Sequence, residues 1–439
     1  MQTKCLSKRK YFGTDGIRER AGEFPLVADF IRRLGFAVGG VLGDSTKRVL
    51  IGRDTRESGE WIFEALSQGF NAQGFAVDYL DIVPTPCLSL MTNNFAYSCG
   101  VIISASHNPY FDNGIKFFLG SGEKLSDDVE LEIEKSLDNA ELLDFKEPIF
   151  NKVDLKIFYS QLDLEGLKVA LDCANGSFFY LAPKILKEFG AQIEAVAISP
   201  DGKNINADCG STHINHLLSF MNNKDFHLGF AFDGDGDRVL AVQGNGKILD
   251  GDSILGILAI YLKEKGRLKN NTLVITVMSN LGLKLAMQEA NINIIETNVG
   301  DRYVYEEMKN NDAVLGGEQS GHIILREFNN TGDGLLAVLM LLEVFKDWGQ
   351  QKFYEISASI RKLPQVLINV RVDNKKAIEE VNTLSIACKR IEKKLAGKGR
   401  ILIRYSGTEP VMRIMLEGEN EEEIKQYAEN FAKLVKQSL

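Results

Sequence analysis

The segment VLIGRDTRESGEWIFEALSQGFNAQGFA, residues 49–76, joins two short apolar runs through a polar bend and an amphipathic stretch. The β-branched residues of the first run favour a strand, and the apolar spacing of the middle favours a helix. The same order begins again at Val169 and at Val274, and it ends at Val196 and Ile295. Three such units predict three successive α/β domains, although periodicity alone also fits one large doubly wound sheet.

The pattern of apolar residues changes after Pro364. A strand, a helix, two strands and a final helix are expected at residues 366–373, 375–395, 401–405, 411–417 and from Glu421 onward. Asn420 stands where an N-cap would start the last helix. This order predicts a smaller α+β module at the C-terminus.

The length of 439 residues would give about three domains of ordinary size. The pattern of segments raises the expected number of domains to four. These domains are expected at residues 1–155, 156–254, 255–364 and 365–439. The predicted fold class is α/β. It consists of three successive βαβ-repeat domains and a smaller C-terminal α+β domain around a central active-site cleft.

The composition excludes several classes of function. Hydrophobic residues make up 44% of the chain and charged residues 25%, as is typical of a folded globular protein. The net charge of −9 disfavours nucleic acids and anionic membranes as partners. The six cysteines are scattered without a C-x-x-C pair, and no apolar run is long enough to span a bilayer. We therefore expect a cytoplasmic protein with no membrane span, zinc knuckle or disulfide framework.

The loop AFDGDGDR, residues 231–238, follows an apolar run and offers the carboxylates of Asp233, Asp235 and Asp237. Oxygen ligands without thiol or imidazole favour a hard cation such as Mg²⁺ or Ca²⁺. An EF-hand loop would need glycine and glutamate where this chain has Arg238 and Gly244. Acids so close together repel one another unless a cation lies among them. The loop predicts a divalent-metal site, and phosphate-binding motifs elsewhere in the chain favour Mg²⁺.

A second motif, VIISASHNP at residues 101–109, places Ser106 and His107 in a polar loop after an apolar strand. A serine hydroxyl acts in catalysis only with a base, a metal or a phosphoryl group. A hydrolase is disfavoured because adjacent side chains seldom point at each other and no G-x-S-x-G motif occurs. The alternative is that Ser106 and Asn108 merely form a turn.

Two further loops suit a phosphorylated sugar. The loop RYSGTEP, residues 404–410, offers small hydroxylated residues and lies between Arg404 and Arg413, which suits phosphate. The loop GGEQSGH, residues 316–322, offers mixed donors and acceptors, which suits sugar hydroxyls. Each loop taken alone could also be an ordinary hairpin turn.

Taken together in this order, the motifs resemble the α-D-phosphohexomutase superfamily, and in particular its bacterial phosphoglucosamine mutases. The resemblance begins at YFGTDGIR, residues 11–18, and extends to the arginine-flanked loop. Its branch is indicated by residues 204–206, 209–213 and 299–303. Glu19 departs from the family pattern, in which glycine is common. Tyr405 also departs, because lysine is frequent there, and this removes a positive charge beside the expected phosphate.

The resemblance implies a role for each motif. Ser106 would carry a phosphoryl group as phosphoserine. One Mg²⁺ per subunit would be bound by Ser106, Asp233, Asp235 and Asp237. Sugar hydroxyls would be bound by Glu318 and Ser320, and the non-reacting phosphate by Arg404, Ser406, Gly407, Thr408 and Arg413. The groups near the transferring phosphoryl would be Arg18, Lys116 and His322. The general base is open among His322, Lys116 and His107, and His107 could instead only shape its loop.

The implied reaction interconverts glucosamine 6-phosphate and glucosamine 1-phosphate through a 1,6-bisphosphate. This isomerase reaction feeds UDP-N-acetylglucosamine and cell-wall precursor synthesis. Gln319 and residues 209–213 favour the amino sugar. The alternatives are a phosphoglucomutase or phosphomannomutase with the same mechanism, and a non-catalytic sugar-phosphate-binding protein. A homodimer is left open.

The charges at this site agree with the implied chemistry. Three aspartates and a phosphoserine carry a charge of about −5 in total. Binding of Mg²⁺ adds +2, so a net charge of about −3 remains. Lys116, Arg238 and Arg18 would meet this remainder. Phosphoryl transfer requires positioning and charge stabilisation more than covalent assistance, so these groups are a sufficient set.

Overall fold

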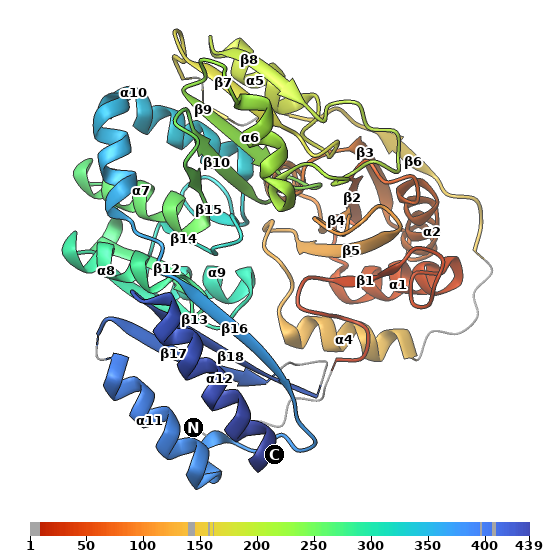
Figure 1. Cartoon of the computed structure of the whole chain (residues 1–439). Helices are drawn as coiled ribbons and strands as arrows, with labels where there is room; N and C mark the ends of the chain where they lie inside the picture. The colour runs from red at the N-terminus through yellow and green to blue at the C-terminus, as the bar shows by residue number, and fades with distance from the viewer. Residues whose placement is uncertain (1–8, 139–144, 157–158, 161, 396, 406–409) are drawn as a thin grey trace. The chain divides into compact units, whose positions relative to one another are not determined.

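The computed structural model describes residues 9–138, 145–156, 159–160, 162–395, 397–405 and 410–439 (Figure 1). The chain divides into two compact units. The first unit consists of Met1–Met278 and Ile292–Glu355, and the second of Ser279–Asn291 and Ile356–Leu439.

The first sheet of the first unit has six strands in the order β1-β5-β4-β2-β3-β6. These strands are β1 Ile17–Arg20, β2 Arg48–Arg53, β3 Ala76–Ile82, β4 Cys99–Ile103, β5 Asp112–Leu119 and β6 Phe150–Lys152. The helices of this part are α1 Ala28–Leu42, α2 Gly59–Ala72, α3 Thr85–Asn94 and α4 Asp127–Asp138. Helix α2 buries Ile62, Phe63, Leu66 and Phe70 at three- and four-residue spacing, which explains why this segment forms an amphipathic helix.

Two smaller sheets complete the first unit. The second sheet, in the order β11-β10-β9-β7-β8, contains β7 Lys168–Asp172, β8 Gln192–Val196, β9 Leu228–Phe232, β10 Val239–Gln243 and β11 Ile248–Leu249. Its helical segments are α5 Leu181–Glu188, η1 Ser211–His213 and α6 Asn215–Met221. The third sheet, in the order β13-β12-β14-β15, contains β12 Thr272–Thr276, β13 Asn293–Thr297, β14 Leu315–Gly317 and β15 Ile323–Leu325. The helical segments that follow in this part are α7 Gly251–Glu264, η2 Lys269–Asn271, α9 Asp301–Asn310 and α10 Gly334–Ser359.

The three predicted strand–helix–strand units are present. Strands β2 and β3, β7 and β8, and β12 and β13 pair in parallel, as strands joined through a crossover helix do. Their connecting helices are α2, α5 and α8 Leu281–Glu289, although α8 belongs to the second compact unit. The described residues form four separate sheets, so the alternative of one large doubly wound sheet is wrong.

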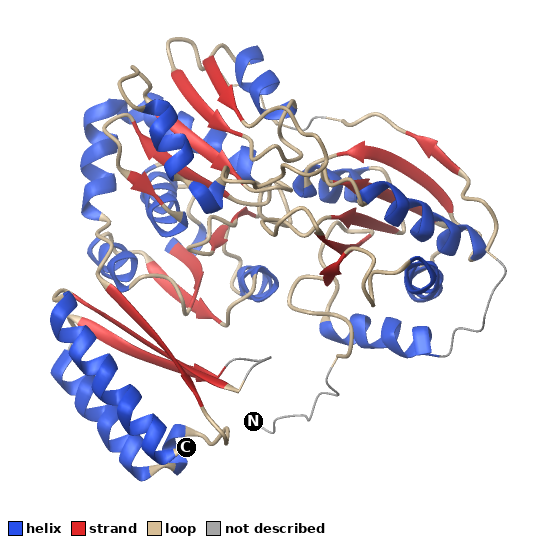
Figure 2. Cartoon of the chain, turned by 45° about the vertical axis from the view of Figure 1, so that its right-hand side comes forward, coloured by secondary structure: helices blue, strands red, loops and turns tan. Residues whose placement is uncertain are grey.

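The second unit contains a three-stranded antiparallel sheet in the order β16-β18-β17. Its elements, besides α8, are β16 Gln365–Arg371, η3 Ile378–Glu380, α11 Asn382–Leu395, β17 Gly399–Tyr405, β18 Val411–Gly418 and α12 Glu421–Ser438. Helices α11 and α12 lie side by side against the sheet (Figure 2). The Asn420 side chain accepts a hydrogen bond from the backbone N–H of Glu423, which confirms the predicted cap.

The first helix of the C-terminal module differs from the expected range. Residues 375–395 were expected as one helix, but α11 begins only at Asn382. The preceding residue, Val381, has extended backbone angles that separate α11 from a short 3₁₀ turn at residues 378–380. The fold class is confirmed, whereas the arrangement around a central cleft stays a prediction. Among the described residues, no helix combines the length and apolar character needed to cross a membrane.

Candidate active site

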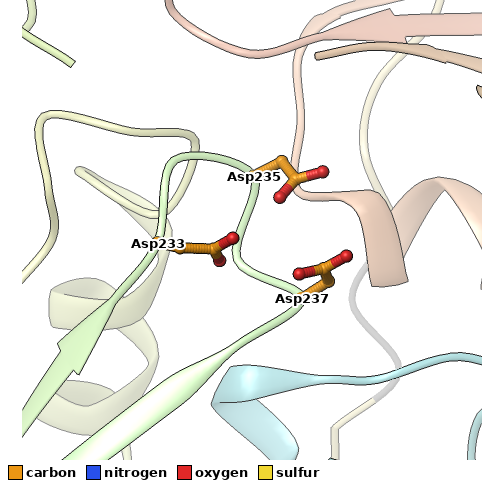
Figure 3. A group of neighbouring side chains, drawn as sticks. All are labelled: Asp233, Asp235 and Asp237. Carbon is orange, nitrogen blue, oxygen red and sulfur yellow. The ribbon is translucent and has the colours of Figure 1, made fainter. Parts of the chain in front are cut away.

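Three aspartates gather on the loop between β9 and β10. The ligand oxygens of Asp233, Asp235 and Asp237 all lie within 4.8 Å of one another, and their carboxylates face the same space (Figure 3). Each residue is at most 2% exposed. Within the described part of the chain, Oδ1 of Asp235 and Oδ1 of Asp237 are buried and have no hydrogen-bond partner. Orphaned carboxylate oxygens in this arrangement fit a hard divalent cation.

The pKa shifts of the aspartates also indicate that the loop fits a cation. Burial, together with the charges of Asp237 and Asp235, raises the pKa of Asp233 well above its usual value. Burial also opposes ionisation of Asp237, but the charges of Lys116 and His322 hold its pKa well below the usual value. One carboxyl of the cluster thus tends to keep its proton when no cation is bound.

Ser106 reaches the aspartate cluster from the loop between β4 and β5. Its hydroxyl donates a hydrogen bond of 2.5 Å to Oδ2 of Asp233, and the residue is 1% exposed. A turn is present, since the N–H of Asn108 bonds to the carbonyl of Ala105 at 3.1 Å. The turn predicted as the alternative is therefore present, and it also places the hydroxyl of Ser106 beside the predicted metal site.

His107 lies closer to Ser106 than the sequence argument expected. Its Nδ1 atom is 3.4 Å from Oγ of Ser106, although the side chains of adjacent residues seldom approach each other. The backbone φ of +54° at Ser106 turns both side chains toward the same region. Nδ1 of His107 is also 3.1 Å from Nη1 of Arg238. Burial, with the charges of Arg238 and Arg18, lowers the pKa of His107 to about 4.

Lys116 on β5 is the buried cation of the site. Its Nζ lies 2.8 Å from Oδ2 of Asp235, 3.0 Å from Oδ2 of Asp15 and 3.6 Å from Oδ2 of Asp237. Burial alone would lower the pKa of Lys116, but these three carboxylates raise it above its ordinary value. The lysine therefore stays charged.

Ionisable groups in mutual contact close a ring with Lys116. Asp15 bonds to Nζ of Lys124 at 2.6 Å, and Lys124 pairs with Asp301. Nε2 of His322 lies 3.3 Å from Asp301, and its Nδ1 lies 3.6 Å from Asp237. Burial would lower the pKa of His322, but the carboxylates of Asp301 and Asp237 raise it. We call Asp237, Lys116, Asp15, Lys124, Asp301 and His322 the charge ring.

A cavity of about 360 Å³ opens beside the charge ring. Its wall includes Arg18, Asp237, Arg238, Asp301, Glu318 and His322. Arg18 donates to the carbonyl of Ala105 at 3.3 Å and pairs with Asp15. The cavity thus combines cationic groups with the predicted sugar-binding glutamate, close to the serine loop.

The loop between β14 and β15 orients Glu318. Its Oε1 accepts the backbone N–H of Gly300 at 3.1 Å, and its Oε2 accepts the hydroxyl of Ser320 at 3.4 Å. The amide of Gln319 donates instead to Oδ2 of Asp250, at 3.4 Å. The described contacts of Gln319 thus lie within the protein, on the residue that caps α7.

The two arginines of the C-terminal loop lie on neighbouring strands. Arg404 on β17 is directly opposite Arg413 on β18, so both side chains project from the same face of the sheet. Burial and the charge of Arg413 lower the pKa of Arg404. Ser406, Gly407 and Thr408 lie outside the described residues.

Sequence reasoning missed several groups that the structure brings to the site. Asp15, Lys124 and Asp301 complete the charge ring, and the hydroxyl of Thr85 donates to Oδ2 of Asp235 at 2.7 Å. Asp15 stood inside the motif at residues 11–18, where a lone acid could have been noticed. Lys124, Asp301 and Thr85 do not stand in a local sequence pattern that would have indicated a role at this site.

Family models match almost the whole chain. They are the Phosphoglucomutase/phosphomannomutase alpha/beta/alpha domains I, II and III and the C-terminal domain, at residues 9–144, 146–246, 250–363 and 367–434. The chain belongs to this family of phosphohexomutases, and its predicted class, an isomerase, is confirmed.

The curated relatives reported next are phosphoglucosamine mutases, one branch of this family. A phosphoglucosamine mutase of Idiomarina loihiensis is 43% identical over 97% of this chain and 98% of its own length. A phosphoglucosamine mutase of Pseudomonas aeruginosa is 45% identical over the same shares of both chains. The resemblance stated from the motifs is therefore confirmed.

Solved structures share the fold. A phosphoglucomutase/phosphomannomutase family protein of Burkholderia thailandensis superposes with a TM-score of 0.80 at 22% identity, covering 98% of both chains. An N-acetylphosphoglucosamine mutase of Aspergillus fumigatus, solved with GlcNAc-6P and magnesium, gives 0.65 at 17% identity over 98% of this chain and 96% of its own.

The two histidines of the site are expected to titrate differently in metal-free, dephosphorylated protein. His107 should stay neutral down to a pKa of about 4, and His322 should hold its proton above the ordinary value of 6.5. Nitrogen-15 NMR titration, with each signal assigned through its His→Gln variant, measures both. A pKa of His107 near 6.5 would show that burial and the charges of Arg238 and Arg18 do not lower it.

Proposed function

We propose that the protein interconverts glucosamine 6-phosphate and glucosamine 1-phosphate, with Ser106 carrying the phosphoryl group. The observation that carries this proposal is the 2.5 Å hydrogen bond from Oγ of Ser106 to Asp233 inside the buried aspartate cluster. The names of the curated relatives, which match along nearly their full length, support the amino sugar as substrate.

The metal of the proposed reaction is a single Mg²⁺ per subunit. Its ligands would be Asp233, Asp235, Asp237 and the phosphorylated Ser106, and the orphaned oxygens of the cluster support this set. When bound, the ion neutralises charge on the phosphoryl oxygens and on the aspartates. The remaining steps depend on groups of the chain itself.

The proposed transfer has two stages. The bond between phosphorus and Oγ of Ser106 breaks while the 1-hydroxyl of glucosamine 6-phosphate bonds to phosphorus and loses its proton. The resulting 1,6-bisphosphate turns around, its 6-phosphoryl group passes to Oγ of Ser106, and a proton returns to the 6-oxygen. Arg18 and Arg238 in the cavity wall stabilise the transferring charge.

The pKa shifts distinguish the three candidate bases. Lys116 and His322 have raised pKa values, so both hold their protons more firmly and suit charge stabilisation. The pKa of His107 is lowered to about 4, which keeps its imidazole neutral and makes it a weak base. We assign charge stabilisation to Lys116 and to His322, which lines the cavity, and keep His107 as the neutral acceptor beside Ser106.

Recognition of the substrate is divided between two loops in this proposal. Glu318 and Ser320 bind sugar hydroxyls from the cavity side. The non-reacting phosphate is bound by the C-terminal module through Arg404, Ser406, Gly407, Thr408 and Arg413. The boundaries at residues 155, 254 and 364 are proposed to separate the four domains, and they lie close to those of the family models. We place the enzyme in the cytoplasm, without nucleic acid or membrane partners.

A phosphoglucomutase or phosphomannomutase is the second candidate function. The observation in its favour is the side chain of Gln319, which bonds to Asp250 and so gives no direct sign of an amine contact. The charge ring and the serine loop would serve a 2-hydroxyl sugar equally well.

A substrate panel separates the two candidates. We expect kcat/KM for glucosamine 6-phosphate to exceed that for glucose 6-phosphate and mannose 6-phosphate by about tenfold or more. The assay uses phosphorylated enzyme, Mg²⁺ and phosphorus-31 NMR detection of the 1-phosphates. Faster turnover of either hexose phosphate would favour the second candidate.

The Ser106→Ala variant tests the phosphoryl carrier. Removing Oγ should lower kcat more than about a thousandfold, because no other group accepts the phosphoryl. Calorimetric binding of glucosamine 6-phosphate should stay within about threefold, since the sugar contacts remain. Ser121→Ala, at an exposed position, is the matched control. Near-normal turnover, or an active wild type with no phosphate on residues 104–108 by mass spectrometry, would place the carrier elsewhere.

The Asp235→Asn variant tests the metal site. Loss of a carboxylate ligand should weaken Mg²⁺ binding more than about tenfold, as measured by isothermal titration calorimetry. Asp225→Asn, whose side chain is 90% exposed, should bind like the wild type. Equal Mg²⁺ affinity in all three proteins would locate the metal outside the aspartate cluster.

A further inference from the structure

Arg56 is a fully buried arginine between β2 and α2. Its Nε donates to Oδ2 of Asp54 at 2.9 Å, and both side chains of this ion pair have no exposed surface. A buried ion pair costs desolvation energy and is retained where the guanidinium satisfies further groups. The remaining donors of Arg56 therefore indicate what the pair is for.

These donors all go to the loop that carries Ser106. Nη2 donates to the carbonyl of Ser106 at 3.0 Å and to that of Asn108 at 2.8 Å. Nη1 donates to the carbonyl of Asp112 at 3.0 Å and also to that of Pro109. Four backbone carbonyls of one loop thus converge on one guanidinium, whose planar fork sets their directions.

The peptide of Ser106 is held from its other side as well. Its N–H donates to Oγ of Ser104 at 2.9 Å, and Oγ of Ser104 donates to Oδ2 of Asp54 at 2.6 Å. The side-chain amide of Asn206, which lies between β8 and β9, donates to the carbonyl of Ser106 at 2.9 Å. Both polar groups of the Ser106 backbone are therefore fixed through the ion pair and its neighbours.

This fixing has a conformational purpose. Ser106 has a φ of +54°, in the left-handed region that residues with a side chain rarely adopt. Such a conformation persists only where surrounding contacts determine it. In the usual φ range, Oγ would leave the direction of Asp233. The Arg56 contacts thus keep the serine hydroxyl directed at the aspartate cluster.

We infer that Arg56 is a positioning residue that holds the Ser106 backbone in place while the phosphoryl group comes and goes. This inference rests on the proposed function of Ser106. A phosphoryl group adds about −2 charge beside three aspartates at each cycle, so the loop experiences a large change in repulsion. Arg56 acts through backbone carbonyls of the loop and is placed to resist that change.

The test compares Arg56→Lys with Arg53→Lys. Arg53 is a matched control because its side chain is 13% exposed and its described polar contacts go to Tyr79, Asp81, Glu60 and the Asp54 carbonyl rather than to the serine loop. Lysine at residue 56 keeps the charge but cannot reproduce the four-carbonyl geometry. We expect phosphoryl transfer from glucose 1,6-bisphosphate to Ser106, and kcat, to fall about 100-fold. KM should stay within about threefold, and the control should lose less than about threefold.

A spectroscopic measurement distinguishes positioning from a general loss of structure. The phosphorus-31 resonance of phospho-Ser106 should shift and narrow in Arg56→Lys because the loop gains mobility, and it should be unchanged in Arg53→Lys. If Arg56→Lys does not fold, Ser104→Ala keeps Arg56 but removes the acceptor of the Ser106 N–H and the hydroxyl bond to Asp54, and it should show the same loss of kcat with unchanged KM. Wild-type transfer and an unchanged resonance in Arg56→Lys, or wild-type turnover by Ser104→Ala, overturn the inference. A wild-type enzyme that takes no phosphoryl group on Ser106 overturns the proposed function and this inference together.

Discussion

Burial of several carboxylates at the end of β9 is the constraint that the rest of the first unit must meet. Asp233, Asp235 and Asp237 are almost without exposed surface, and ionised groups so close together repel strongly where water is excluded. Lys116 contacts two of them and also binds Asp15. Without this buried cation, the carboxyl groups could stay buried only in their protonated, neutral form. The position of Lys116 therefore decides whether the cluster is charged and able to bind a cation.

The charge ring joins loops that belong to three different sheets. Lys116 lies on β5, Asp237 follows β9, and His322 directly precedes β15. Buried ion pairs add little net stability, because desolvation offsets their attraction, but removal of one partner leaves a costly unpaired charge. A closed ring therefore tolerates the loss of no member. Its effect is to fix the loop ends against one another more than to stabilise the fold.

Local patterns in the sequence predict the strand–helix–strand units, the aspartate loop and the cap at Asn420, because each depends on residues close along the chain. They do not predict the ion pairs of Lys124 with Asp15 and Asp301, which join distant segments of one unit. Neither does periodicity reveal that Val381 adopts an extended conformation and delays the start of α11. Ser106 is predicted as a residue of interest, but its backbone conformation depends on contacts from elsewhere in the fold.

The charged residues found only in the structure add one net negative charge to the site. Asp15 and Asp301 add two negative charges and Lys124 adds one positive charge. His322, which the motifs predicted, has a raised pKa beside Asp301 and Asp237. Phosphoserine and Mg²⁺ would carry opposite charges of about two, so the two together would change the net charge of the buried site little. Either one alone leaves an uncompensated charge in a medium that penalises it heavily. In the proposed function, loading of the two would therefore be coupled, and the backbone of Ser106 would have to keep one position through both states, which the contacts of Arg56 favour.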